Sequence, residues 1–257
     1  MKITVLCENT TSNESLAYEH GLSLYIETES HKILFDMGQS DIFYENALKL
    51  GVDLKKVDIA VLSHGHYDHG GGLRKFLEVN NKAKVYLSSR AFEPHYNGEK
   101  YIGLDVSLQD NKRLVFVDDE YEITQDMTLY SCKKESRDWE INSGGLSTVK
   151  DGEKIPDSFL HEQYLYIAEN GRKVLISGCS HKGVANIINC FDVDTVIGGF
   201  HTSKWDDESV LDLAKTLSLT KCDFYTCHCT GVEQYEIMKN VMSKLSYIST
   251  GDTFELA

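Results

Sequence analysis

The stretch S-H-G-H-Y-D-H-G-G-G-L, residues 63–73, places three imidazoles and a carboxylate within six positions, directly after an apolar run. Residues 59–62, Ile-Ala-Val-Leu, have the length and composition of a buried strand, and the polar, glycine-rich segment after them cannot continue it. The histidines and the aspartate therefore lie at the carboxyl end of a strand. Imidazole nitrogens and carboxylate oxygens are ligands that zinc and similar divalent ions take. The stretch predicts a metal site rather than a polar loop whose histidines face water.

The length and the charge of the chain narrow the class of protein. A chain of 257 residues suits one large α/β domain or two small ones, and its 41% hydrophobic content is that of a soluble globular enzyme. The formal net charge of −14 argues against a nucleic-acid partner, because a phosphate backbone needs a basic face. No nucleic-acid partner is therefore expected, and the sequence leaves a homo-oligomer open.

The sequence also indicates a compartment. No apolar run approaches the roughly 18 residues of a membrane span, and residues 1–6 are too soon interrupted by Glu8 to form a signal peptide. Seven cysteines, scattered over a chain of this size, fit reduced thiols better than a disulfide framework. We expect a cytoplasmic protein with no membrane contact.

Hydrophobic periodicity predicts the secondary structure of both halves. In the first half, strands are expected at 3–7, 22–27, 32–36, 59–62, 85–87, 114–117 and 128–130, and helices at 41–50 and 73–79. In the second half, strands are expected at 164–168, 173–177, 195–197, 223–226, 247–248 and 253–254, and helices at 183–191, 207–217 and 232–245. The turn Glu169-Asn170-Gly171-Arg172 is a hairpin signal.

Residues 133–158 form a polar connection between the two halves, with Gly144-Gly145, Gly152 and Pro156. A connection of that length inside a compact domain is typically functional or disordered. Our hypothesis is a lid loop over the metal site, and a plain surface excursion is the alternative.

Three strands of the second half end in histidine. His181, His201 and His228 each follow an apolar run, as His64 does. Loops at one edge of a mixed sheet converge on a shared crevice. We therefore expect His181 and His228 to reach the first cluster, whereas His201 is open between a ligand and a structural residue.

Other histidines give weaker signals. His20 opens a predicted strand and His161 precedes one, so both could border the site, and His95 lies in a loop that could be surface or cleft. The C-H-C of residues 227–229 lacks the paired C-x-x-C spacing of a structural zinc motif.

Residues 62–69, L-S-H-G-H-Y-D-H, match the H-x-H-x-D-H signature of the metallo-β-lactamase superfamily. Gly71-Gly72-Leu73 resembles its continuation, and Phe35-Asp36-Met37-Gly38 resembles its D-T-G turn, with Met where Thr is common. The resemblance implies one domain over residues 1–257, of the α+β class, folded as a four-layer αββα sandwich of two mixed β-sheets flanked by helices. It also implies that Asp36 hydrogen-bonds a metal-bound imidazole, since ligating histidines need such an acceptor.

Shorter segments resemble one branch of the superfamily, related to the dihydropterin phosphate synthase of methanopterin biosynthesis. These segments are residues 19–23, 162–163, 177–183, 198–201 and 228–231. The branch consists mostly of uncharacterised hydrolases, and its name implies a pterin-like substrate.

Two positions depart from the superfamily's pattern. Cys179 stands where many members carry an aspartate that bridges two metals. Either the thiolate bridges, or His181 takes over, or one metal binds weakly, and we expect His181. The usual middle histidine has no certain equivalent, and His161 is the one candidate near its place.

The resemblance implies a cofactor of divalent metal, expected to be two Zn ions, with Fe or Mn as alternatives. The expected ligands are His64 and His66 for one ion, Asp68 and His69 for the other, and His181 and His228 to complete the shells. Asp68 and His181 are expected to take part in catalysis. The residues expected around these ligands or against the substrate are Asp36, His20, His201, Lys182 and Cys179.

The expected reaction follows from the ions. They would lower the pKa of a shared water from 15.7 toward about 7, and the metal-bound hydroxide would attack a phosphate or carbonyl centre of a small anionic substrate. The predicted function is a metal-dependent hydrolase or transferase. Two alternatives remain. The first is a di-iron oxidoreductase, which His66 makes less expected, and the second is a binding protein with a degenerate site, which the intact signature makes less expected.

Overall fold

The structure is a computed structural model that describes residues 1–132 and 140–256. The chain divides into two compact units. Unit 1 comprises Met1–Asp118, Ser143–Gln163 and Ser249–Ala257, and unit 2 comprises Asp119–Asn142 and Tyr164–Ile248. Each unit has its own β-sheet and its own apolar core. That the chain forms a single domain stays a prediction.

Unit 1 is built on a seven-stranded sheet in the order β18-β1-β2-β3-β4-β5-β8. Its strands are β1 (Lys2–Cys7), β2 (Ser23–Glu27), β3 (Lys32–Phe35), β4 (Ile59–Val61), β5 (Lys84–Ser88), β8 (Leu114–Val117) and β18 (Thr253–Glu255). Pairing is antiparallel from β18 to β3 and parallel from β3 to β8. The carboxyl ends of β3, β4 and β5 therefore share one edge, which is where the signature segment begins.

The helices of unit 1 cover the sheet with apolar side chains. They are α1 (Ile42–Lys49), α2 (Tyr67–Gly70) and α3 (Leu73–Val79), with the 3-10 turns η1 (Leu54–Lys56) and η2 (Val106–Leu108). Phe43 of α1 and Phe76 of α3 are fully buried in one cluster with Leu34 of β3 and Val85 of β5. The helices predicted at 41–50 and 73–79 are confirmed, with α1 one residue shorter at each end.

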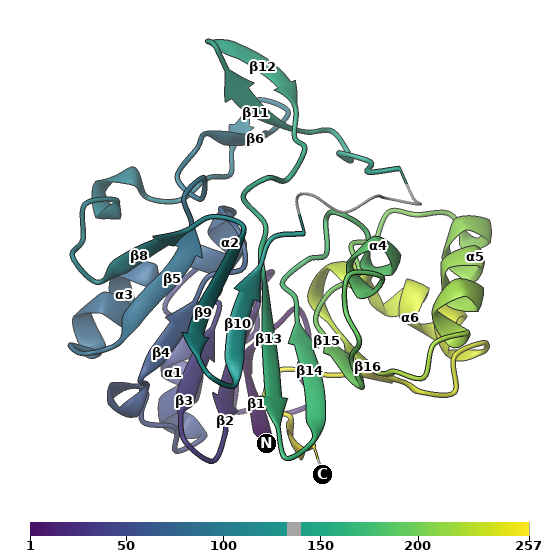
Figure 1. Cartoon of the computed structure of the whole chain (residues 1–257), viewed down its shortest axis with the longest axis horizontal. Coiled ribbons are helices and arrows are strands. Elements are labelled where there is room, and N and C mark those ends of the chain that lie inside the picture. The colour runs from purple at the N-terminus through teal and green to yellow at the C-terminus, as the bar shows by residue number, and fades with distance from the viewer. Residues whose placement is uncertain (133–139, 257) are drawn as a thin grey trace. The chain divides into compact units, whose positions relative to one another are not determined.

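Unit 1 also holds a small four-stranded sheet in the order β12-β11-β6-β7. Its strands are β6 (His95–Asn97), β7 (Lys100–Tyr101), β11 (Leu146–Lys150) and β12 (Glu153–Pro156), and Figure 1 shows three of them by label. None was predicted, because the strands are short and largely solvent-accessible, so they lack the alternation of a half-buried strand.

The small sheet corrects part of one expectation. Residues 146–156 form the β11–β12 hairpin and not an irregular loop. Residues 133–139 of the predicted lid lie outside the described residues, and a lid function for 133–158 stays a prediction.

Unit 2 has a second seven-stranded sheet, in the order β17-β16-β15-β14-β13-β10-β9. Its strands are β9 (Glu120–Thr124), β10 (Met127–Tyr130), β13 (Tyr164–Glu169), β14 (Arg172–Ile176), β15 (Thr195–Ile197), β16 (Asp223–Thr226) and β17 (Leu245–Tyr247). The β13–β14 turn is the predicted hairpin, and Asn170 and Gly171 have the positive φ angles, 53° and 78°, that a two-residue turn of this kind requires. The strands from β14 to β17 pair in parallel, so their carboxyl ends share one edge.

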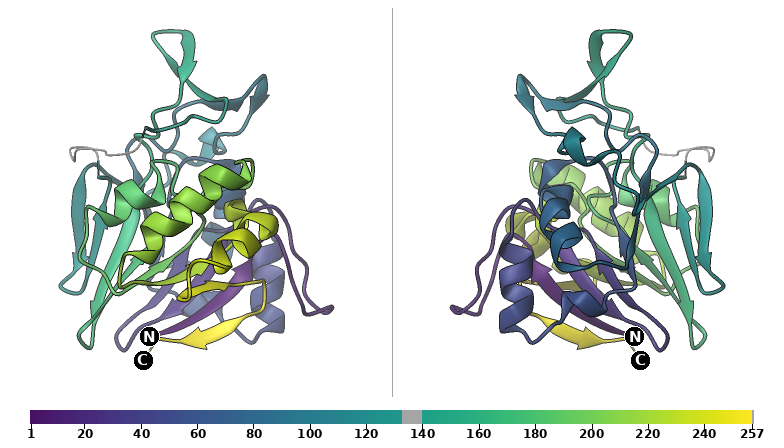
Figure 2. Two further views of the ribbon diagram at one scale, coloured as in Figure 1. Left: turned by 90° about the vertical axis from the view of Figure 1, so that its right-hand side faces the viewer. Right: turned by 90° about the vertical axis from the view of Figure 1, so that its left-hand side faces the viewer.

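The helices of unit 2 are α4 (Val184–Ile188), α5 (Asp207–Ser218) and α6 (Val232–Lys239), with the 3-10 turn η3 (His228–Thr230). Helices α5 and α6 lie side by side (Figure 2) and bury Leu213, Leu217 and Met238 in one apolar cluster. The prediction that the last helix runs to residue 245 is wrong. The helix ends at Lys239, and Met242 and Leu245 enter the core from a turn and from β17. Among the described residues, no helix is long and apolar enough to cross a membrane.

Candidate metal site

The backbone that leads into the signature segment is held from two sides in unit 1. The Leu62 N–H donates to the Tyr86 carbonyl at 2.9 Å. The side-chain amide of Gln163 donates to the carbonyls of Leu62 (2.9 Å) and Tyr86 (3.2 Å), and the Gln163 N–H donates to the Ser63 carbonyl (2.8 Å). The strand end that carries the histidines is therefore anchored before the first ligand.

Asp36 organises the motif from the neighbouring strand end. Its side chain is fully buried, and its φ of 58° is the left-handed conformation that Asp tolerates better than most residues. Oδ1 accepts the Ser63 N–H at 2.7 Å, and Oδ2 accepts the Ser63 hydroxyl and the His69 Nδ1–H, each at 2.7 Å. The structure thus places Asp36 against an imidazole of the signature, as the resemblance implies. That this imidazole binds a metal stays a prediction.

These contacts fix the tautomers of two histidines. Because the Ser63 hydroxyl donates to Asp36, its oxygen accepts the Nδ1–H of His64, 2.8 Å away. His69 donates its own Nδ1–H to Asp36. In both rings the lone pair therefore sits on Nε2, which is the form that ligates a metal.

Asp68 and His69 lie at a spacing that suits one divalent ion. Asp68 Oδ2 is 3.7 Å from His69 Nε2. Two ligands of one tetrahedral ion are about 3.4 Å apart, given a metal–nitrogen bond of roughly 2.0–2.1 Å. These two residues therefore fit the ion expected for them.

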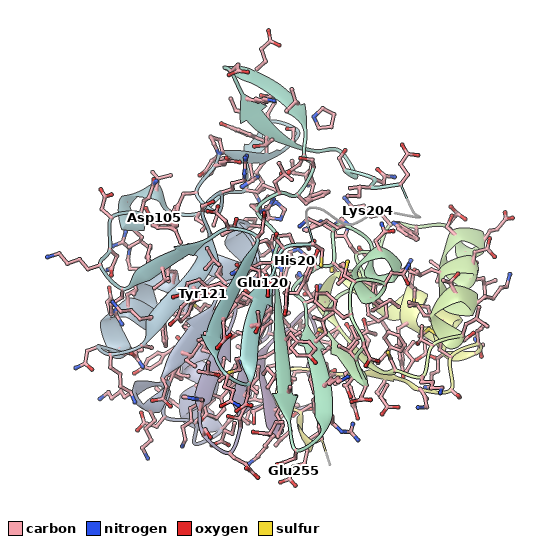
Figure 3. All side chains as sticks on the ribbon, in the orientation of Figure 1. His20, Asp105, Glu120, Tyr121, Lys204 and Glu255 are labelled. Atoms are coloured by element: carbon pink, nitrogen blue, oxygen red, sulfur yellow. The ribbon has the colours of Figure 1, made fainter. Side chains whose placement is uncertain are left out.

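His20 contacts Asp68 from the solvent side. Its side chain is 56% exposed and is marked in Figure 3, and its Nε2 lies 3.3 Å from Asp68 Oδ2. The Asn9 amide lies 3.2 Å from His20 Nδ1. Since the amide nitrogen donates, Nδ1 accepts and the proton of the ring lies on Nε2, which faces Asp68. His20 therefore orients Asp68, and its exposure keeps a substrate contact open as a prediction.

A second group of imidazoles surrounds His66. Its ring centroid is 4.6 Å from that of His64, 5.1 Å from that of His161 and 5.4 Å from that of His95. All four rings are buried. The sequence left His95 open between surface and cleft and gave His161 as a residue that could border the site, and the structure places both in this buried group.

Asp157 links two of these imidazoles and was not predicted. Its Oδ2 lies 2.9 Å from His95 Nδ1 and 3.3 Å from His161 Nε2, and its Oδ1 accepts the Phe159 N–H at 2.7 Å. Potential ligand atoms of His66, His95, Asp157 and His161 all lie within 4.8 Å of one another. The sequence offered no local signal for Asp157, because it follows a strand, β12, that was itself missed.

The charges in this group follow from burial and hydrogen bonding. Burial raises the pKa of Asp157, but the hydrogen bonds from His161 and His95 outweigh it and hold the pKa well below its usual value. Burial, with the neighbouring His161, lowers the pKa of His66 well below its usual value. The carboxylate is therefore ionised and His66 neutral, which is the state that metal binding requires.

In unit 2, the three predicted histidines follow three adjacent parallel strands. His181, His201 and His228 come after β14, β15 and β16, and the rings of His181 and His201 have centroids 4.2 Å apart. Cys179 Sγ lies within 4.8 Å of a ring nitrogen of His181 and of one of His228. His201 and His228 have left-handed φ angles, 54° and 52°, a strained conformation that is common at functional sites. Metal binding by His181 and His228 stays a prediction.

Lys182 has a buried position. Its Nζ donates to the Ser131 carbonyl at 2.5 Å and lies 5.5 Å from the centroid of the Tyr164 ring. The side chain is 1% exposed, so these contacts hold the amine within unit 2. A contact with substrate stays a prediction.

Comparison with known proteins decides the family. The profile of the metallo-β-lactamase superfamily matches residues 18–218, more than half of the chain. The chain belongs to this superfamily. Superfamily members generally bind divalent metals, and the cluster of His66, His95, Asp157 and His161 in unit 1 has ligand atoms that fit such an ion.

Three relatives show how far the similarity to superfamily members extends. An uncharacterized protein of Methanocaldococcus jannaschii is 30% identical over 238 residues, covering 89% of this chain and 90% of that protein. The 7,8-dihydropterin-6-methyl-4-(β-D-ribofuranosyl)-aminobenzene-5′-phosphate synthase of the same organism is 29% identical over 261 residues, covering 90% of this chain and 88% of the synthase. The crystal structure of Tm1679, a metal-dependent hydrolase of the β-lactamase superfamily, superposes with a TM-score of 0.84 at 32% identity, covering 100% of this chain and 99% of that one.

These similarities confirm the predicted superfamily and the predicted fold class, α+β with the αββα sandwich of the metallo-β-lactamases. The identity of the metal and the number of ions stay predictions.

Proposed function

We propose that the protein is a metal-dependent hydrolase or transferase that acts on a phosphate or carbonyl centre of a small anionic substrate. The observation that carries this proposal is the Asp36 network, in which one buried carboxylate fixes the tautomers of His64 and His69. A polar loop without a metal has no need of two imidazoles held with Nδ1 protonated. The network therefore supports a working metal site in this member of the superfamily.

The chain's residues divide the work in this proposal. His64 and His66 would hold one divalent ion, and Asp68 and His69 would hold a second. Divalent ions bound there would lower the pKa of water toward about 7 and stabilise negative charge on a phosphate or carbonyl oxygen. Asp36 orients His69 directly and His64 through Ser63.

Acceptance of a proton is assigned to Asp68, with His20 orienting its carboxylate. Asp68 Oδ2 lies 3.3 Å from His20 Nε2, the ring nitrogen that carries the proton, and His20 is more than half exposed.

The proposed substrate class rests on charge and on one relative. Bound cations would attract an anion even though the chain carries a net charge of −14, because the local charge of a bound metal dominates its surroundings. The similarity to a synthase whose name includes a dihydropterin and a phosphate supports a pterin-like or phosphate-bearing substrate.

Metal analysis followed by activity assays tests this proposal. The purified protein is expected to bind zinc, manganese or iron, and to cleave at least one of a set of phosphodiester, lactone and thioester substrates in a metal-dependent manner. His66→Ala should abolish turnover and leave the circular dichroism spectrum unchanged. The control His31→Ala, in the turn before β3, should keep full activity. A wild-type protein that binds none of the three metals would overturn the proposal.

A further inference from the structure

We propose that His95 is a metal ligand beside His66, and that His161, which lies near the expected place of the superfamily's middle histidine, orients the site without binding the ion. This inference rests on the proposed function only in assuming that the signature segment binds a divalent ion. It concerns which imidazoles of unit 1 hold that ion.

The hydrogen bond at Nδ1 of His161 fixes the tautomer of this ring. The Gly65 N–H lies 2.9 Å from His161 Nδ1, and a backbone N–H can only donate, so Nδ1 carries the lone pair. A neutral imidazole has one N–H, which is then on Nε2, 3.3 Å from Asp157 Oδ2. Binding an ion through Nδ1 would break the bond from the Gly65 N–H, and binding through Nε2 would require that nitrogen to give up its proton.

His95 has the opposite arrangement. Its Nδ1 lies 2.9 Å from Asp157 Oδ2, and a carboxylate accepts, so Nδ1 carries the proton and Nε2 carries the lone pair. Among the described residues, His95 Nε2 has no hydrogen-bond partner although it is buried from solvent. A carboxylate that fixes Nδ1–H and leaves Nε2 for the ion is the arrangement found for ligating histidines.

The position of the ring also suits an ion shared with His66. The two ring centroids are 5.4 Å apart and the ring planes cross at 80°. Two imidazoles bound to one tetrahedral ion have centroids about 5 Å apart, given a metal–nitrogen bond of roughly 2.0–2.1 Å.

Gly65 makes room for the His95 ring within the signature itself. A Cβ at this position would lie 3.0 Å from His95 Nε2 and would overlap the Ala91 carbonyl oxygen. Gly65, the residue between His64 and His66, therefore leaves room for the His95 ring because it has no side chain. Its N–H also orients the His161 ring.

Asp157 is the group that orients both rings. Oδ1 accepts the Phe159 N–H and Oδ2 contacts both imidazoles, so its oxygens are already occupied by donors. The small sheet fixes the geometry: His95 begins β6 and pairs with Thr148 of β11, and the Asp157 N–H donates to the Leu146 carbonyl at 3.0 Å.

A matched pair of variants, His95→Gln and His161→Gln, tests the inference. In His161→Gln the new side-chain carbonyl would still accept the Gly65 N–H, whereas neither variant keeps an imidazole at the changed position. Zinc affinity is measured by competition with a chelator, and the ligand set is followed by the visible absorption of the cobalt-substituted protein. His95→Gln should lower zinc affinity by more than 100-fold and change the cobalt bands. His161→Gln should stay within the roughly 10–100-fold loss typical of an orienting residue, with the bands unchanged.

Three controls keep the outcomes distinct. Asp157→Asn should behave like His161→Gln, His66→Ala should lose the metal, and circular dichroism should show that each variant is folded. His95→Asn repeats the test if His95→Gln does not fold. Equal losses in the paired variants, or a larger loss in His161→Gln, would overturn the inference while the proposed function stands. A wild-type protein without metal would instead overturn the proposed function.

Discussion

Two buried carboxylates in unit 1, Asp36 and Asp157, each hold two imidazoles, but they reach the site from different parts of the chain. Asp36 contacts His69 directly and His64 through Ser63. Asp157 contacts two rings through a single oxygen, Oδ2. The first network lies at the ends of two adjacent parallel strands of the main sheet, whereas the second depends on the small sheet.

The two networks differ in which backbone groups and side chains each carboxylate stabilises. The Asp36 network also accepts the Ser63 N–H, so it supports the backbone of the signature as well as its rings. The Asp157 network supports the loop at Phe159 and two rings outside the signature. We therefore expect loss of Asp36 to damage folding and metal binding together, and changes near Asp157 to affect metal binding more than folding.

The largest expected effect is that of Asp36→Ala. The change leaves the Ser63 N–H, the Ser63 hydroxyl and the His69 Nδ1–H without their acceptor in a fully buried place. We expect the free energy of unfolding to fall by about 3–5 kcal/mol, as for other buried charged partners, measured by urea denaturation. The control Asp58→Ala removes a surface carboxylate paired with Lys82 and should cost at most about 1 kcal/mol. Similar losses in both variants would show that Asp36 supports the fold no more than a surface carboxylate does.

A smaller effect is expected from metal addition. Zinc at 100 times its dissociation constant should raise the free energy of unfolding of the apo protein by about 2.7 kcal/mol, because the ion binds the native state. Thermal unfolding in the presence and absence of a chelator measures it. His66→Ala should show no such gain, and a gain of the same size in that variant would place the ion elsewhere.

The smallest effect is expected for Gly65→Ala, which changes the contact between the signature segment and the Asp157 network. The new Cβ would collide with the Ala91 carbonyl and press on His95, and overpacking of this kind costs about 1–3 kcal/mol. Zinc affinity should fall as well, measured by chelator competition. Gly98→Ala, in the β6–β7 turn where a Cβ would meet nothing within 4 Å, should leave zinc affinity unchanged. An unchanged zinc affinity in Gly65→Ala would show that His95 does not bind the ion.

The histidines of the Asp36 network were accessible from the sequence because they are local: with His66 and Asp68, His64 and His69 lie in six consecutive positions. Asp36 itself, 33 positions from His69, was expected only from the resemblance of residues 35–38 to the superfamily's D-T-G turn. Apart from β9, which was not predicted, the strands of the two seven-stranded sheets and the helices α1, α3 and α5 have strong periodicity, so their positions were predicted to within one or two residues.

The Asp157 network was not accessible in the same way. His95 and Asp157 are 62 positions apart, and what joins them is a sheet of two- to five-residue strands with no buried face to generate a pattern. The early end of α6 has a similar cause, because Met242 and Leu245 continue the helical spacing while a turn and a strand carry them. An apolar residue at helical spacing indicates that its side chain is buried, but it does not identify whether a helix, a turn or a strand carries that residue.

The two ends of the small sheet are expected to differ in their tolerance of insertions. At one end, β6 begins at His95 and β12 is followed by Asp157, both in the proposed site. At the other end, the chain turns back at Gly98 and at Asp151-Gly152. Both turns are exposed, and their glycines have open space around them. A peptide tag or a fluorescent reporter inserted at either turn would thus be carried on strands that end at the proposed ligand and at its orienting carboxylate.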